Sequence, residues 1–484
     1  MTPPASSTLI EHLEFVITCD GADRVIHDGA ILIEGDRIKD LGATAEVTER
    51  MRSSPSSQPV ERLDGRRLGL APGFVDSHVH LSETLSRAVF PDVIDTRTWV
   101  FHWAKPFYAH VSPADEEVGS LLGTAEMLRG GTTCFLDMGA QNDPAPVASA
   151  VEQTGIRGIT GRHAADVKPA EIPRGWSAEM VDHHFFPDPE TALEALAETV
   201  AAWNGSAGGR LGVWVNIEGK EPCSLDLHVG ARELAARLGV GTTYHLATSL
   251  AEAEISQRRH GNWPITRIAR AGGLGDNLVI AHAVAVTPEE VDLLSSHRTK
   301  VAFCPSTSLK LAKGATSIGK YPEMMEAEVT VGLGTDGVSA AGNLNLHRQV
   351  HLAAGLFKDA RMDASLVGAR QALRMATIDG AKALGMDDQI GSLEVGKKAD
   401  FVLWDLDHPE WIPYGDPLSA LVWSVSTASV HETWVDGRPC FRDGRVIGID
   451  EAALHMEARS RAADIRARAG LGREDIPLTT LLYQ

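Results

Sequence analysis

Short apolar runs alternate with amphipathic segments through the long middle part of the chain. The apolar runs, which predict strands, cover 132–137, 156–161, 211–217, 242–246, 278–283, 300–304 and 330–334. Apolar residues at helical spacing fill intervening segments such as 121–129, 193–203 and 228–238. Alternating strands and helices are typical of a parallel sheet. Roughly eight such units predict an α/β fold of the (β/α)8 TIM-barrel type.

The two ends of the chain have a different pattern. Residues 29–38 predict a strand, a tight turn and a second strand, and strand signals return at 391–404, 430–435 and 446–447. The simplest packing joins the two ends, so we expect a small, discontinuous β-sandwich domain. The expected division is a sandwich from 1–68 and 390–450, a barrel from 69–389, and a polar helical tail from 451–484.

One predicted strand ends in two histidines, His78 and His80, separated by one residue. Side chains alternate faces along a strand, so these two imidazoles converge. In a barrel, functional side chains lie at the carboxyl ends of the strands. Three more predicted strands end in His245, His282 and Asp336. Together these residues predict a metal site.

Imidazoles and one carboxylate suit Zn²⁺ or Fe²⁺ and leave a position for water. A bound metal lowers the pKa of that water towards about 7. Asp336 can take the proton of the water and deliver it to a leaving group, while His282 orients the water or polarises the substrate. We therefore expect one divalent ion, zinc in first place, although the same ligands accept iron, cobalt or manganese.

Composition argues against nucleic acid and membrane as partners, so the expected partner is a small-molecule substrate. The chain has 484 residues and a formal net charge of -20, without a basic stripe, so we expect no nucleic acid. We see no leader pattern at the start and no apolar run long enough to span a membrane, so we expect a cytoplasmic protein. The scattered cysteines, which form no Cys-x-x-Cys pair, are expected to be reduced core residues.

The chain resembles the amidohydrolase superfamily, in the branch that holds triazine chlorohydrolases, guanine deaminase and adenosylhomocysteine deaminases. The matching motifs are Pro72–His80, Gly130–Thr133, Cys304–Gly314, Gly334–Gly337 and Gly396–Asp400. The resemblance implies a mononuclear site. Its implied ligands are His78, His80, His245 and Asp336. It also implies a homo-oligomer, since relatives are commonly dimers or larger.

The chain departs from this branch at one position. Deaminases of the branch place a glutamate three residues after the strand 5 histidine, where it protonates the ring of the substrate; here Thr248 stands there. A hydroxyl donates a hydrogen bond but is no strong acid near neutral pH. Glu252, four residues further, is expected to be positional.

We therefore expect hydrolysis of an acyclic, non-peptide C–N bond, of the amide, carbamate or urea type. The alternative is deamination or dechlorination of a purine, pyrimidine or triazine ring. Another alternative concerns the metal count. Some branches of the superfamily use a carbamylated lysine after strand 4 to bridge two metals, and Lys220 follows that strand here.

Candidate substrate-binding residues follow the first barrel strand. Trp99, His102 and Trp103 lie in an aromatic segment there, which forms an apolar wall for a flat ligand or packs a helix on the barrel rim. His163, at the end of strand 3, and Thr248 complete the expected pocket. Apolar walls favour an aromatic or alkyl-bearing substrate.

Overall fold

Two parallel sheets occupy the middle of the chain. The computed structural model describes residues 7–53, 59–139, 143–169, 172 and 175–471. One sheet has the order β6 (Phe74–Val79), β7 (Thr132–Asp137), β8 (Arg157–Thr160) and β9 (Leu211–Val213). The other has the order β10 (Val215–Gly219), β11 (Thr242–Leu246), β12 (Leu278–His282), β13 (Lys300–Phe303) and β14 (Val331–Leu333). The predicted alternation of strands and helices is confirmed.

The two sheets meet at Trp214, which interrupts the strand expected over 211–217. Its N–H donates to the carbonyl of Thr160 (2.8 Å), so β9 follows β8, while Val215 N–H donates to Gly241 (3.1 Å) and starts β10. On the other side, Asp336 N–H donates to the carbonyl of His78 (2.8 Å). The end of β14 therefore runs beside β6.

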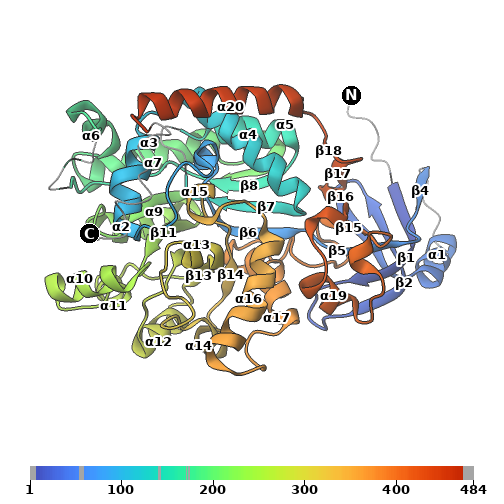
Figure 1. Cartoon of the computed structure of the whole chain (residues 1–484). Coiled ribbons are helices and arrows are strands. Elements are labelled where there is room, and N and C mark those ends of the chain that lie inside the picture. The colour runs from blue at the N-terminus through green and yellow to red at the C-terminus, as the bar shows by residue number, and fades with distance from the viewer. Residues whose placement is uncertain (1–6, 54–58, 140–142, 170–171, 173–174, 472–484) are drawn as a thin grey trace.

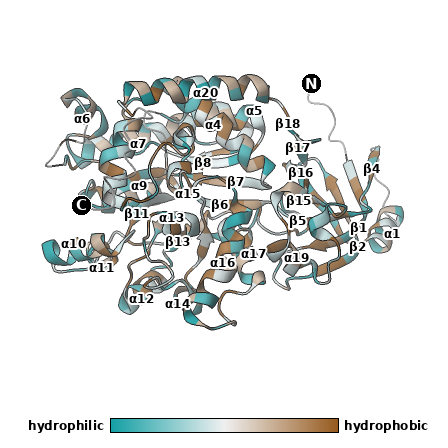
Figure 2. Cartoon of the chain, in the orientation of Figure 1, coloured by the Kyte–Doolittle hydropathy of each residue, from teal (hydrophilic) through white to brown (hydrophobic). Residues whose placement is uncertain are grey.

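Helices surround these strands (Figure 1) and carry the more hydrophilic residues (Figure 2). Among them are α4 (Pro113–Arg129), α7 (Pro189–Trp203) and α9 (Leu225–Leu238). All three begin earlier than the apolar spacing predicted. Ser112, Asp188 and Ser224 accept hydrogen bonds from the first-turn N–H groups, so each helix begins at its cap.

The two ends of the chain share one nine-stranded sheet. Its order is β18 (Arg445–Val446), β17 (Arg438–Arg442), β16 (Val430–Val435), β15 (Phe401–Asp405), β5 (Leu68–Pro72), β1 (Ser7–Ile17), β2 (Val25–Glu34) and β3 (Arg37–Ala43), and β4 (Val60–Asp64) pairs with β1. The antiparallel pair β5–β15 joins the N-terminal and C-terminal segments. The expected union of the two ends is thus present, as one sheet.

The predicted polar helix near the C-terminus is α20 (Glu451–Arg468). It lies along α4 (Figure 1), where Arg461 and Arg468 pair with the buried Asp115 at 3.0 and 3.2 Å. No helix in the described ranges is both long and apolar enough to cross a membrane.

Candidate metal centre

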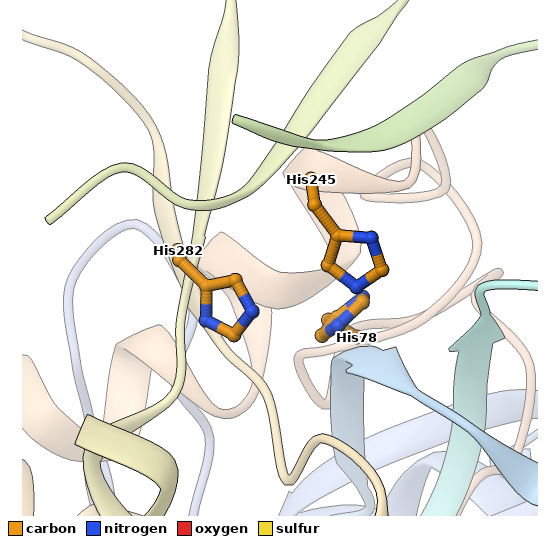
Figure 3. Close-up of side chains that lie close together, drawn as sticks. All are labelled: His78, His245 and His282. Carbon is orange, nitrogen blue, oxygen red and sulfur yellow. The ribbon is translucent and has the colours of Figure 1, made fainter. Parts of the chain in front are cut away.

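Four strand ends bring the predicted site residues together. His80 Nε2 lies 3.2 Å from His245 Nε2, and Asp336 Oδ1 lies 3.4 Å from His80 Nε2 and 3.6 Å from His78 Nε2. His282 Nε2 lies 3.6 Å from Asp336 Oδ2. Figure 3 shows the rings of His78, His245 and His282 turned towards one another. The five residues singled out from the sequence therefore form one cluster.

Burial keeps the imidazoles of His80, His245 and His282 neutral because it lowers their pKa values. It lowers the pKa of His80 to about 3 and, with the nearby His78, lowers the pKa of His245 well below its ordinary value. Burial alone would raise the pKa of Asp336, but the surrounding histidines lower it well below its ordinary value. At neutral pH the cluster thus presents imidazole lone pairs beside a carboxylate.

The cluster fits a divalent cation. Both ring nitrogens of His78 are buried, and neither has a hydrogen-bond partner within the described parts of the chain. An unpartnered buried imidazole is costly, and a metal ion would satisfy it. His245 Nδ1 lies 3.0 Å from the carbonyl of Glu218, so its proton belongs there and Nε2 keeps a free lone pair.

The backbone bends sharply at two of these strand ends. His282 (φ 76°) and Asp336 (φ 62°) both adopt the left-handed region, which costs energy for residues with a Cβ. Gly334 makes room, since a Cβ there would lie 2.9 Å from the His78 Cβ. These bends turn the ends of β12 and β14 towards the cluster.

Glu83 contacts the Nδ1 side of the His80 ring and was not predicted. Its Oε1 lies 3.4 Å from His80 Nδ1, and its Oε2 accepts a hydrogen bond from the Tyr108 hydroxyl (2.7 Å). Burial raises the pKa of Glu83 to about 8. A glutamate three residues after His80 was the available sequence signal.

Thr248 and Glu252 are joined by a hydrogen bond. The Thr248 hydroxyl donates to Glu252 Oε2 (2.7 Å), and the same carboxylate accepts the N–H groups of Ala247 and Thr248, each at 2.8 Å. Thr248 is 1% exposed. Glu252 thus holds the turn that follows β11, as a positional residue does.

Cys304 and Lys220 also lie near the cluster. Cys304, at the end of β13, offers its Sγ within 4.8 Å of ligand atoms of His78 and Asp336. Burial raises the pKa of this thiol, and a protonated thiol is a weak ligand. Lys220 follows β10 and lines a small cavity beside Leu246 and Glu252. The cysteines are all free and buried, as predicted.

The predicted pocket residues lie in two places. Trp99 and Trp103, on the π-helical segment Trp99–Ala104, pack on Phe90 with ring centroids 6.0 and 6.4 Å away, and His102 is exposed. This packing agrees with the rim alternative, in a cluster that also includes residues of α20. His163 keeps a buried Nε2 without a partner among the described residues.

A half-buried ion pair near His163 was not predicted. Glu218, in β10, accepts hydrogen bonds from Lys105 Nζ (3.1 Å) and lies 3.0 Å from His184 Nε2. Burial would raise the pKa of Glu218, but Lys105 and His184 lower it well below its ordinary value. Sequence reasoning missed this pair because its members are far apart along the chain.

The chain matches the family model described as "Amidohydrolase family" over residues 70–440. It is 34% identical to the 5-methylthioadenosine/S-adenosylhomocysteine deaminase of Symbiobacterium thermophilum, over 93% of this chain and 97% of the relative. It is 30% identical to the 5'-deoxyadenosine deaminase of Methanosarcina acetivorans, over 94% and 98% of the two chains.

Solved structures agree with this likeness. An adenosine deaminase from Xanthomonas campestris with bound zinc is 28% identical, with a TM-score of 0.83 over 96% of this chain and 100% of that one. The zinc complex of an atrazine chlorohydrolase from Arthrobacter aurescens shares the fold, with a TM-score of 0.81, 24% identity, and 94% and 100% coverage. The protein has this α/β fold of the TIM-barrel type.

The family match spans most of the chain, and the sequence relatives cover nearly all of it. The protein therefore belongs to the amidohydrolase family and is a metal-dependent hydrolase of carbon–nitrogen bonds.

Proposed function

We propose that the protein cleaves an acyclic C–N bond next to a carbonyl carbon, in an amide, carbamate or urea that carries an aromatic or alkyl group. The observation that carries this proposal is the bond between Thr248 and Glu252 beside the metal cluster. Deamination of a ring needs a proton donor for the ring nitrogen, and this pair leaves none free at that position. An acyclic substrate depends less on such a donor.

His78, His80, His245 and Asp336 would hold the ion, which we propose to be zinc. When bound, a divalent ion acts as a Lewis acid and lowers the pKa of a water molecule towards about 7. The neutral imidazoles and the carboxylate described above are the donors that such an ion prefers. The presence of zinc in two structural relatives supports this choice.

Asp336 and His282 carry the proton and orientation steps of the proposal. Asp336 Oδ2, which lies 3.6 Å from His282 Nε2, accepts the proton of the attacking water. The same oxygen then delivers that proton to the departing nitrogen, which leaves as a neutral amine. His282 orients the water or the carbonyl oxygen by a hydrogen bond from its ring. Trp99, His102, Trp103, His163 and Thr248 remain the proposed substrate-side residues.

A panel of substrates tests the proposal. Amine release from anilides and phenylureas is expected, and ammonia release from 5'-methylthioadenosine, S-adenosylhomocysteine and 5'-deoxyadenosine is not. Asp336→Asn is expected to lower kcat by about a thousandfold or more, because it removes the proton acceptor. The exposed Asp359→Asn is the matched control. Full turnover of the metal-free protein would contradict the proposal.

The second candidate is deamination of an adenosine derivative. Relatives at 30 to 34% identity carry such names, and they cover nearly the whole chain. Ammonia release from the adenosine compounds, with no amine from the ureas and anilides, would favour this candidate.

We also propose a finer description of the fold. The two parallel sheets would form one closed barrel of eight strands, with β9 and β10 as a single interrupted strand. The hydrogen bond from Asp336 N–H to His78 supports closure between β14 and β6. The terminal sheet would fold into a sandwich, with domain boundaries near residues 69, 390 and 451. Light scattering after size-exclusion chromatography tests the expected homo-oligomer.

A further inference from the structure

Lys313 is a buried lysine at the metal cluster. It lies inside the motif Cys304–Gly314 but was given no role from the sequence. It lies in the loop after α13 (Pro305–Lys310), is 7% exposed, and places its Nζ 3.5 Å from His282 Nε2. The same His282 nitrogen lies 3.6 Å from Asp336 Oδ2. The lysine and the aspartate therefore both approach one ring atom of the proposed reaction centre.

The loop holds Lys313 in this position. The residues on either side, Ala312 (φ 48°) and Gly314 (φ 83°), both adopt the left-handed region. Lys313 N–H donates to the carbonyl of Ser308, and the Ser308 hydroxyl oxygen accepts Ala315 N–H, each at 3.0 Å. A left-handed alanine is strained, and strain of this kind persists where the surroundings enforce it.

The ammonium group lacks a counter-ion. Across the residues that the structure describes, no carboxylate lies within ion-pair distance of Lys313 Nζ, and His282 is its one hydrogen-bond neighbour. An ammonium has three N–H donors, so at least two need another acceptor. Burying an unpaired charge costs several kcal/mol, which makes such a lysine improbable as a purely structural residue.

Lys313 supplies a hydrogen-bond donor that the end of β11 does not supply. The Thr248 hydroxyl donates its hydrogen bond to Glu252, so the β11 end directs no free donor at the substrate. Lys313 Nζ, 3.5 Å from His282 Nε2, instead brings its N–H donors to the cluster from the loop after α13.

We propose that Lys313 is a catalytic residue that donates a hydrogen bond from Nζ to the substrate atom that becomes negative when water adds. This inference rests on the proposed function. The water oxygen bonds to the carbonyl carbon, the π electron pair moves onto the carbonyl oxygen, and the water proton passes to Asp336. The carbonyl oxygen, which is now negative, accepts the hydrogen bond from Lys313. When the electron pair returns, the C–N bond breaks and the nitrogen takes the proton from Asp336, while Lys313 keeps its own protons.

Kinetics of zinc-loaded variants test the role. With the best substrate of the panel, Lys313→Met is expected to lower kcat about a hundredfold, the effect of losing one donor to a developing oxyanion, and to change KM by less than about threefold. Lys313→Arg keeps the charge and is expected to recover part of kcat. Zinc content should stay equal in all variants. Lys382→Met, in α18 (Ile378–Ala383), where the lysine side chain is solvent-accessible, is the matched control.

Methylphosphonate, a tetrahedral oxyanion, tests the same role without turnover. Calorimetry is expected to show binding to the zinc-loaded protein that weakens at least about tenfold in Lys313→Met and little in Lys313→Arg. Equal affinity in wild type and Lys313→Met, or no binding at all, overturns the inference even when a substrate is known. If no panel compound is hydrolysed while the phosphonate result holds, the proposed function fails and the role of Lys313 stands.

Discussion

At the scale of single residues, the site depends on how fully its polar groups are paired by hydrogen bonds. Glu252 is the clearest case, because one carboxylate serves two backbone N–H groups and one hydroxyl. His78 is the opposite case, with two buried ring nitrogens that no described residue satisfies. The hydrogen bonds of Glu252 stabilise a turn, whereas the unpartnered nitrogens of His78 indicate a ligand-binding site.

Replacing Glu252 by alanine should destabilise the fold. The change leaves the buried N–H groups of Ala247 and Thr248 without acceptors, so we expect the free energy of unfolding to fall by about 3 kcal/mol. Urea denaturation followed by circular dichroism measures this free energy of unfolding. Glu254→Ala, exposed on the helix α10 (Leu250–His260) that also holds Glu252, should cost far less. Equal losses in both variants would contradict the assignment.

His228 should make stability depend on pH. Its side chain is buried without a hydrogen-bond partner in the described residues, and burial lowers its pKa from 6.5 to about 4. Between these values the unfolded chain binds the extra proton, so stability falls as the pH drops below 6.5.

The loss from this group between pH 7 and pH 5 amounts to about 2 kcal/mol. His228→Leu should remove that part of the pH dependence in urea denaturation curves, whereas the exposed His455→Leu should leave it unchanged. The same slope in His228→Leu and wild type would refute the role of His228.

At the scale of elements, the site is built where strands end and the backbone turns. β14 ends at Leu333, and Gly334 then passes close to β6 before Asp336 turns inward. The close approach allows no side chain at Gly334, whose Cβ would lie 2.9 Å from both the carbonyl oxygen and the Cβ of His78. The glycine thus sets the spacing between two metal-site strands.

Gly334→Ala should therefore disturb the metal site. Its added methyl group pushes β6 and His78 away from Asp336, and we expect metal affinity to fall by about ten- to a hundredfold, as for other changes behind a ligand. Competition with a chelating dye measures the affinity. Gly368→Ala has open space at its Cβ and serves as the control. An unchanged affinity in Gly334→Ala would mean that the strands adjust freely.

At the scale of the whole molecule, a buried ion cluster fastens the parallel strands to the terminal sheet. Arg157, on β8, pairs with Asp400 (3.1 Å) and Asp436 (2.5 Å), which lie at the ends of β15 and β16. Arg157 and Asp400 are almost fully buried. Asp400 also belongs to the motif at Gly396–Asp400, so this part of the resemblance has a structural explanation.

Asp400→Asn should weaken this connection between the parallel strands and the terminal sheet. It leaves Arg157 buried beside a single carboxylate, and we expect a loss of about 3 to 5 kcal/mol in the free energy of unfolding. Urea denaturation and limited proteolysis between the sheet and the strands would report it. Asp388→Asn, on an exposed turn, is the control. Since Asp400 is not in the metal cluster, kcat of the folded variant should change little.

The sequence by itself determined the alternation of strands and helices and the members of the buried histidine–aspartate cluster. It did so because strands 132–137 and 242–246 are short apolar runs with clear limits, and because His78, His80, His245, His282 and Asp336 stand at such limits. It left out β5 and β17, whose glycine, proline and charged residues give no strand pattern without their neighbours. β5 acquires its strand form by pairing with β1 and β15.

Only the tertiary structure decided how distant polar groups meet. Lys313 comes to His282, Glu218 to Lys105 and His184, and Arg157 to Asp400, although these partners are widely separated along the chain. Local spacing carries no signal for such pairs, because chain folding rather than periodicity brings them together. The donor that we propose for catalysis belongs to this second group, which is why the metal site could be predicted from the sequence and Lys313 could not.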